Sequence, residues 1–151
     1  MNNLDQLLDG YKNSCDIYRY IDLRLLSNEN GVFWCKVPLS KQTKNHVNMM
    51  HASVLFAIGE LLGGMVCSQH IAKPEKFQPV VRDFKVDFRA PAFTDVTAEA
   101  FFDAAQAEEM NKQLEENGRF DFQLAAKLTD DNGQLVAETL GSYAIRNFMG
   151  G

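Results

Sequence analysis

The stretch HASVLFAIGELLGGMV, residues 51–66, decides how the rest of the chain has to fold. At about 100° per residue, it presents apolar side chains around its whole circumference, which is typical of a helix surrounded by protein rather than by water. Glu60 is the only acidic residue in it. We therefore expect Glu60 to be buried, at a cost of several kcal/mol unless its carboxylate is paired, hydrogen-bonded or neutralised.

The composition of the whole chain fits one soluble domain. A length of 151 residues is usual for one domain, and we expect a single α+β domain over residues 1–151. The apolar run 54–66 is too short to span a bilayer, and the acidic N-terminus lacks the features of a secretory signal, so we expect a cytoplasmic protein with no membrane span. The net charge of −5 disfavours nucleic-acid binding, for which a basic field supplies most of the affinity.

The cysteines argue against two kinds of site. Cys15, Cys35 and Cys67 are odd in number and contain no C-x-x-C pair, which disfavours a disulfide framework and a structural zinc site. We expect Cys35 and Cys67 to lie in the core. The three histidines and Cys67 show no recognised metal-ligand spacing, so we expect neither a metal nor a cofactor.

The order of the elements follows from where the apolar period changes between 3.6 and 2. Helical spacing predicts two further helices, at residues 3–12 and 106–117. Alternation predicts six strands, at residues 21–25, 33–39, 83–89, 96–102, 120–128 and 135–145. We therefore expect an antiparallel sheet with one face on the buried helix and the other facing solvent or a partner.

Small residues surround Glu60 on the helical wheel. Those within about 60° of it include Ser53, Ala57, Gly63 and Gly64. Two consecutive glycines in a helix interior cost about 1 kcal/mol each relative to alanine, so we expect another backbone or a ligand to approach closely there. The alternative is structural: the glutamate can be a neutral acid in a core network, and the glycines can simply permit tight packing.

A polar loop, residues 45–51, leads into the N-terminal end of this helix. The first N–H groups of a helix have no intrahelical acceptor, so those of Ala52 and Ser53 are expected to be free for a carbonyl oxygen that becomes negative. Glu60 lies nine residues beyond His51, about 13 Å along the axis, so one subunit does not bring both to one carbonyl. Two antiparallel copies related by a two-fold axis can, which favours a homodimer.

Asn45, His51 and Glu60 form the pattern Asn-x5-His followed by an acidic residue nine positions after the histidine. Together with the order strand, strand, buried helix, four strands, this pattern resembles the hotdog-fold acyl-CoA thioesterases, and within them the phenylacetate-degradation-type branch. The strand and turn at 83–91 are also similar to that family. The helix at 106–117, before the fifth strand, resembles a sub-branch known mostly as an uncharacterised domain family. The resemblance covers nearly the whole chain.

The resemblance implies a hotdog fold, an antiparallel sheet wrapped around a long central helix, with its site at the interface of a homodimer or a dimer of dimers. By the resemblance, Glu60 matches the general base or nucleophile, Asn45 the residue that orients the water or thioester, and Ala52 the residue whose N–H polarises the carbonyl. His51 belongs to the site or only caps and orients the loop. Ala52 and Ser53 replace two glycines of the family pattern.

Residue chemistry and resemblance together favour hydrolysis of an acyl-CoA or acyl-carrier thioester by a water that Glu60 activates. We expect the small residues around Glu60 to line a groove that binds the substrate, and one residue of a basic cluster to bind an anionic group of the ligand. These residues are Ser53, Ala57, Gly63, Gly64 and Arg89.

Three other functions stay open. Non-catalytic binding of a fatty-acyl ligand in the same groove is the main alternative. Hydration or dehydration of an acyl thioester is disfavoured, because the family spacing for that chemistry is longer than that from His51 to Glu60. A structural or interaction dimer is the third.

Overall fold

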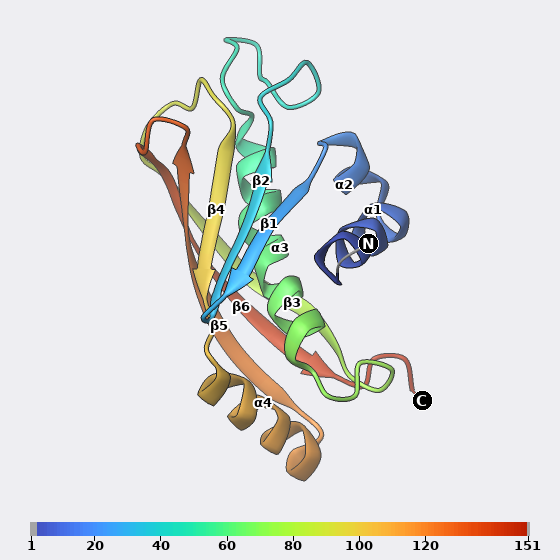
Figure 1. The fold of residues 1–151 in the computed structure, drawn as a ribbon. Coiled ribbons are helices and arrows are strands. Elements are labelled where there is room, and N and C mark those ends of the chain that lie inside the picture. Colours follow the sequence, from blue (N-terminus) through green and yellow to red (C-terminus); the bar gives the residue numbers. More distant parts are fainter. Residues whose placement is uncertain (1–2, 151) are drawn as a thin grey trace.

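The computed structural model describes residues 3–150, in which one six-stranded antiparallel sheet curls around a central helix (Figure 1). The helices are α1 (Asn3–Ser14), α2 (Asp16–Tyr20), α3 (Ala52–His70) and α4 (Ala104–Asn117). The strands are β1 (Arg24–Glu29), β2 (Val32–Val37), β3 (Gln78–Phe88), β4 (Val96–Phe101), β5 (Phe120–Asp130) and β6 (Leu135–Arg146). Their order in the sheet is β1-β2-β4-β5-β6-β3, and the arrangement is the hotdog fold that the sequence predicts.

α3 fills the space that the sheet encloses. Its buried side includes five large apolar residues: Leu55, Ile58, Leu62, Met65 and Val66. Each such side chain stabilises the fold by about 1.5–3 kcal/mol when it leaves water. Within residues 3–150, α3 is the one helix whose length and composition would allow it to cross a membrane. In this protein, 56% of its apolar 18-residue stretch is buried in the interior. Its central position accounts for its apolar composition, and a cytoplasmic location stays a prediction.

A tyrosine explains why α3 has a glycine at position 63. The ring of Tyr143, on β6, lies where a Cβ atom at Gly63 or at Gly141 would have to be. The Tyr143 hydroxyl donates a hydrogen bond of 2.9 Å to the carbonyl oxygen of Glu60. The close approach expected at Gly63 is therefore made by Tyr143 and not by a ligand.

The N-terminal third of the chain differs most from expectation. Residues 16–20 form the short helix α2, and β1 begins at Arg24, so the strand expected at 21–25 is shifted towards the C-terminus. Asn30 and Gly31 both have positive φ, 53° and 80°, the backbone that a two-residue hairpin turn requires. The turn therefore lies at Asn30 and Gly31, and Asn28 stays in the strand.

β3 is an edge strand that starts earlier than expected, at Gln78. Pro79 is tolerated there because an edge strand has one side without ladder hydrogen bonds. α4 begins two residues earlier than predicted, since Asp103 and Gln106 form a capping box, and it ends at Gly118 as the sequence predicts. Cys35 and Cys67 are buried as expected, and Cys15 is exposed.

Gly63 and Gly64, adjacent in α3, should respond in opposite ways to alanine. Gly63→Ala places a methyl group into the Tyr143 ring and should lower the free energy of unfolding by about 1–3 kcal/mol. Gly64→Ala meets only the Tyr11 hydroxyl, at 3.7 Å, and should be neutral or stabilising by up to about 1 kcal/mol. Urea unfolding of both variants measures the difference. Equal effects at both positions would contradict the packing described for Tyr143.

Candidate functional site

Glu60 lies in the middle of α3, on the side that the sheet does not cover, and its side chain is half-buried rather than fully buried. Burial alone raises the pKa of its carboxyl above the ordinary value. Among the residues that the structure describes, no side chain forms a hydrogen bond or an ion pair with this carboxylate. A carboxylate that is partly dehydrated and unpaired is a stronger base than one in water.

His51 caps the N-terminal end of α3. Its Nδ1 accepts a hydrogen bond of 3.0 Å from the Ser53 N–H and lies 2.7 Å from the Ser53 hydroxyl. The Ser53 N–H, which we expected to be free, is therefore occupied. The Ala52 N–H is free as expected: nothing in residues 3–150 accepts a hydrogen bond from it. Of the two readings of His51, the structure supports the cap.

Asn45 fixes the loop before α3 through its side-chain oxygen and its backbone N–H, and its side-chain NH₂ group remains without an acceptor in the described residues. Its Oδ1 accepts hydrogen bonds of 3.0 Å from the N–H groups of Val47 and Met49. Its own N–H donates to the Met49 carbonyl oxygen at 2.7 Å. The side-chain amide N–H groups have no acceptor in the described part of the chain. Asn45 therefore presents a fixed, unused donor, as a residue that orients a carbonyl or a water must.

A mostly apolar cavity of about 540 Å³ opens between this loop, the start of α3 and the end of β3. Its lining brings together Asn45, Ala52 and Arg89 with Met49, Met50, Leu55, Phe88 and residues 90–92. A second hollow of about 430 Å³, lined by Ser53, Phe56 and β3 side chains, adjoins it through Ala52 and Phe88. Arg89 forms an ion pair with Glu138 at 2.8 Å, so its guanidinium is held at the rim.

The structure therefore divides the predicted site residues into two groups. Asn45, Ala52 and Arg89 meet at the cavity, and Ser53 lines the adjoining hollow. Glu60 lines neither and lies eight residues along α3 from Ala52, about 12 Å. Ala57 and Gly64 are half-buried near Glu60. Gly63 is buried under Tyr143, so its assignment to the substrate is corrected.

Three tyrosines near Glu60 were not predicted. Tyr11 on α1, Tyr18 on α2 and Tyr143 on β6 are partly or fully buried, and burial followed by the nearby Glu60 charge raises the pKa of Tyr18 and Tyr143. Burial raises the pKa of Tyr11 to about 12, with Glu60 among the smaller causes. Tyr11 continues the apolar helical spacing of α1 and could have been found. Tyr18 lies in a five-residue helix that carries no period.

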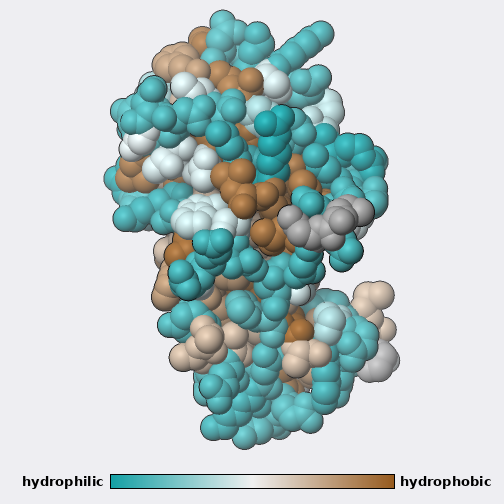
Figure 2. All heavy atoms as spheres, in the orientation of Figure 1, coloured by the Kyte–Doolittle hydropathy of each residue, from teal (hydrophilic) through white to brown (hydrophobic). Residues whose placement is uncertain are grey.

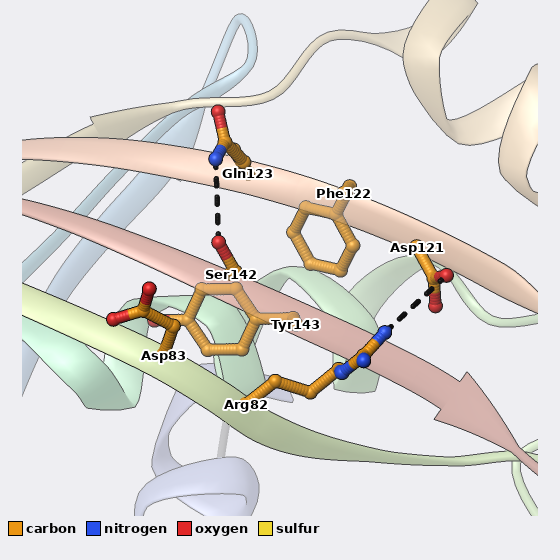
Figure 3. A pocket seen from close by; sticks show the side chains of 7 residues that line it. All are labelled: Arg82, Asp83, Asp121, Phe122, Gln123, Ser142 and Tyr143. Atoms are coloured by element: carbon orange, nitrogen blue, oxygen red, sulfur yellow. Dashed lines mark hydrogen bonds and ion pairs between the residues drawn. The ribbon is translucent and has the colours of Figure 1, made fainter.

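Another hollow, of about 490 Å³, lies over β3, β5 and β6 (Figure 3). Arg82 points towards Asp121, at 3.8 Å, and Gln123 donates a hydrogen bond of 3.3 Å to Ser142. Asp121 also pairs with two further arginines, at positions 119 and 146. Arg82 and Asp121 thus pair with each other across this hollow, and none of the predicted site residues lines it. In the described residues, no three His, Cys, Asp or Glu side chains gather in a way that could hold a metal ion.

Comparison with known proteins agrees with this architecture. The family model described as "Domain of unknown function (DUF4442)" matches residues 21–143. No curated protein matches the sequence. A Pseudomonas aeruginosa protein of unknown function, called a "Probable Thioesterase", is 28% identical, with a TM-score of 0.84 over 97% of each chain. A Haemophilus influenzae thioesterase is 15% identical, with a TM-score of 0.76 over 99% of this chain and 94% of its own.

The pKa of Glu60 predicts how its replacement changes stability. In the unfolded chain the Glu60 carboxyl ionises at its ordinary pKa, whereas in the folded protein burial raises that pKa. As the pH rises from the ordinary to the raised pKa, the folded protein is therefore increasingly destabilised relative to the unfolded chain, and above the raised pKa the loss is constant. Glu60→Gln should therefore raise the melting temperature at pH 8, by about 2–4 °C for each kcal/mol relieved, and leave it unchanged near pH 4. Glu108→Gln, an exposed position on α4, is the control. Thermal unfolding is measured at both pH values. An equal rise in melting temperature at pH 4 and pH 8 would contradict burial of the charged carboxylate as the cause.

Proposed function

The chain belongs to the DUF4442 family, and from this premise we propose that it hydrolyses the thioester bond of an acyl-CoA or acyl-carrier substrate. The observation that carries the proposal is the unpaired, half-buried carboxylate of Glu60 on the same helix as the free N–H of Ala52. Base and oxyanion donor are the two groups that hydrolysis of an activated acyl group requires. The spacing of Asn45, His51 and Glu60 supports the finer assignment to the phenylacetate-degradation-type branch.

The proposed site lies between two copies of the chain. About 12 Å separates Glu60 from the Ala52 N–H within one copy, which is too far for one thioester. A two-fold axis that pairs two α3 helices antiparallel would bring Glu60 of one copy towards Ala52 and Asn45 of the other. Each dimer would then hold two equivalent sites.

Edge strand β3 supports such a dimer. Phe88 is 56% exposed and Phe56, on α3, 42% exposed, and Val80 and Val81 of the same strand are exposed as well. Phe56 packs on Phe84 with ring centroids 4.5 Å apart, so the helix and the strand present one apolar surface. An edge strand with exposed apolar side chains can pair with a strand of another chain, and we infer that β3 pairs with β3 of a second copy.

The chemistry balances with the protein groups alone. The Glu60 carboxylate takes a proton from a water molecule as the water oxygen bonds to the thioester carbonyl carbon. The resulting oxyanion accepts hydrogen bonds from the Ala52 N–H and the Asn45 amide. The C–S bond then breaks, and the departing sulfur takes the proton from Glu60. The products are a carboxylic acid and a free thiol, and Glu60 is again a carboxylate.

The cavity suggests where the remainder of the substrate lies. Met49, Met50, Leu55 and Phe88 give it an apolar lining that suits an acyl chain or the aliphatic part of the carrier arm. Arg89 at the rim is placed to attract an anionic group, at the cost of its ion pair with Glu138. Ser53 and Ala57 lie on the same, partly exposed side of α3 as Glu60.

One observation favours non-catalytic binding as a second candidate. A carboxyl with a raised pKa is neutral over more of the pH range, and a neutral carboxyl can donate a hydrogen bond to the head group of a bound fatty acid. Glutamine at position 60 would keep such a donor. A binding module would therefore retain its ligand in Glu60→Gln and release no thiol in either form.

Release of free thiol from short- to long-chain acyl-CoAs, by wild type and by Glu60→Gln, tests the proposal. We expect turnover by the wild type on some chain lengths and a loss of at least about 100-fold in kcat for the variant, because the base is removed. Thermal unfolding checks that the variant is folded, and Glu108→Gln should keep wild-type turnover. Absence of thiol release by the wild type across the whole panel would overturn the proposed function.

A further inference from the structure

The hollow over β3, β5 and β6 holds positive charge that has no part in the chemistry proposed above. Three arginines, at positions 82, 119 and 146, lie 3.8, 3.3 and 2.7 Å from the carboxylate oxygens of Asp121. Asp83 is the other carboxylate of the lining, and Figure 3 shows it pointing away from Arg82. In a chain with a net charge of −5, three guanidiniums around one carboxylate are a local positive excess.

Arg146 is the arginine of this group that the protein itself holds in place. Its Nη2 donates a hydrogen bond to Asp121 Oδ1 at 2.7 Å. Its Nη1 donates to the carbonyl oxygens of Ile145, at 2.7 Å, and of Phe120, at 3.3 Å. The side chain is 24% exposed. Arg146 is therefore a fixed partner of one oxygen of Asp121.

Arg82 and Arg119 share the oxygen that remains, Oδ2 of Asp121. Arg119 lies 3.3 Å from it and Arg82 lies 3.8 Å from it, and both side chains are 61% exposed. A separation of 3.8 Å is too long for a hydrogen bond, and Arg82 has no other acceptor in the part of the chain that the structure describes. A guanidinium has five N–H donors, so most donors of these two arginines are unused. Arg119 follows α4, in the lower part of the molecule, where hydrophilic residues predominate (Figure 2).

A β-bulge brings Arg82 into this hollow. The register of β3 against β6 shifts between Val81 and Asp83, which leaves Arg82 as the extra residue. A bulge turns a side chain away from the regular alternation of its strand, and bulges are common next to functional sites. Figure 3 shows Arg82 reaching across the hollow towards Asp121. The strand therefore departs from regular pairing at the residue that carries the unused guanidinium donors.

The remainder of the hollow supplies a neutral donor and space for a ligand. Gln123 donates a hydrogen bond of 3.3 Å to the Ser142 oxygen, and the Ser142 hydroxyl proton has no acceptor within residues 3–150. The stacked rings of Phe122 and Tyr143, with centroids 5.1 Å apart, also line the hollow. Its volume of about 490 Å³ is within the range of small-molecule sites.

A phosphate group is the ligand that fits this arrangement best. It carries a charge of about −1.5 to −2 at pH 7 and three acceptor oxygens, and guanidiniums bind it through paired N–H donors. One phosphate can therefore be bound by Arg82 and Arg119 together, while Asp121 keeps Arg146 as its own partner. A carboxylate has a single charge and only two oxygens to share between two guanidiniums.

We propose that the hollow over β3, β5 and β6 is a phosphate-binding site, with Arg82 and Arg119 as its main donors and the Ser142 hydroxyl as a third. The phosphate belongs either to the nucleotide end of a CoA substrate or to a separate phosphorylated compound. Arg82 lies six residues before Phe88, which lines the cavity at the start of α3, so about 20 Å of β3 separates the two places. The first source rests on the hydrolysis proposed above, because a CoA thioester would have to extend from one place to the other.

Arg82→Gln removes the guanidinium and keeps a polar side chain. Lys85→Gln is the matched control, because Lys85 lies on the same strand, is 70% exposed and does not line the hollow. Isothermal titration calorimetry at low salt measures the binding of adenosine 3′,5′-bisphosphate and of inorganic phosphate. Thiol release is measured from an acyl-CoA and from the same acyl group on N-acetylcysteamine, which carries no phosphate.

We expect the wild type to bind adenosine 3′,5′-bisphosphate, and Arg82→Gln to weaken this binding at least about tenfold, because charged hydrogen bonds are lost. Lys85→Gln should match the wild type. If the phosphate is that of CoA, Arg82→Gln should raise the KM for the acyl-CoA about tenfold relative to the KM for the N-acetylcysteamine thioester. An unchanged ratio of the two KM values, with weakened phosphate binding, would assign the site to a separate phosphorylated compound.

Two results would overturn the phosphate site: a wild type that binds neither probe, or an Arg82→Gln variant that binds them as tightly as the wild type. Neither result bears on hydrolysis, which thiol release from the N-acetylcysteamine thioester measures by itself. If no thiol is released from either thioester while Arg82→Gln still weakens phosphate binding, hydrolysis is overturned and the phosphate site is supported.

Discussion

The packing of the Tyr143 ring against Gly63 sets how closely α3 lies to the sheet, and the rest of the structure depends on that distance. No side chain at position 63 could coexist with the ring, and the hydroxyl fixes the contact by its hydrogen bond to the Glu60 carbonyl oxygen. These two contacts fix the distance of α3 from the sheet and the rotation of α3 about its own axis. Its apolar side chains face the sheet, and Glu60 is left on the side that the sheet does not cover.

This rotation separates the two halves of the proposed chemistry along one helix. The cap that His51 forms occupies the Ser53 N–H and leaves the Ala52 N–H as the free donor beside the Asn45 amide. Glu60 lies more than two turns further on, and α1 is tied to the same helix by the hydrogen bond between the Tyr11 and Ser68 hydroxyls. Neither half is sufficient alone for the proposed hydrolysis, so the proposed site requires a second copy of the chain to bring them together.

The sequence predicts the elements that carry a clear period and misses those that do not. The all-round apolar pattern of residues 51–66 predicts the central helix, and alternation predicts the strands, because both patterns state which side of an element meets the core. The pair Gly63 and Tyr143 could not be predicted, since no local signal links residues so distant in the chain. α2 is a short helix without a period, so the packing of Tyr18 on Tyr11 also depends on tertiary structure.

The most direct test of the central claim is complementation between two inactive chains. Glu60→Gln and Asn45→Ala, purified separately, are mixed, unfolded and refolded together, and thiol release from an acyl-CoA is measured. If Glu60 of one copy acts with Asn45 of the other, each mixed dimer has one intact site, and activity should return to about a quarter of wild type. Mixed dimers that form, as seen by native mass spectrometry, yet release no thiol would contradict a site shared between two copies.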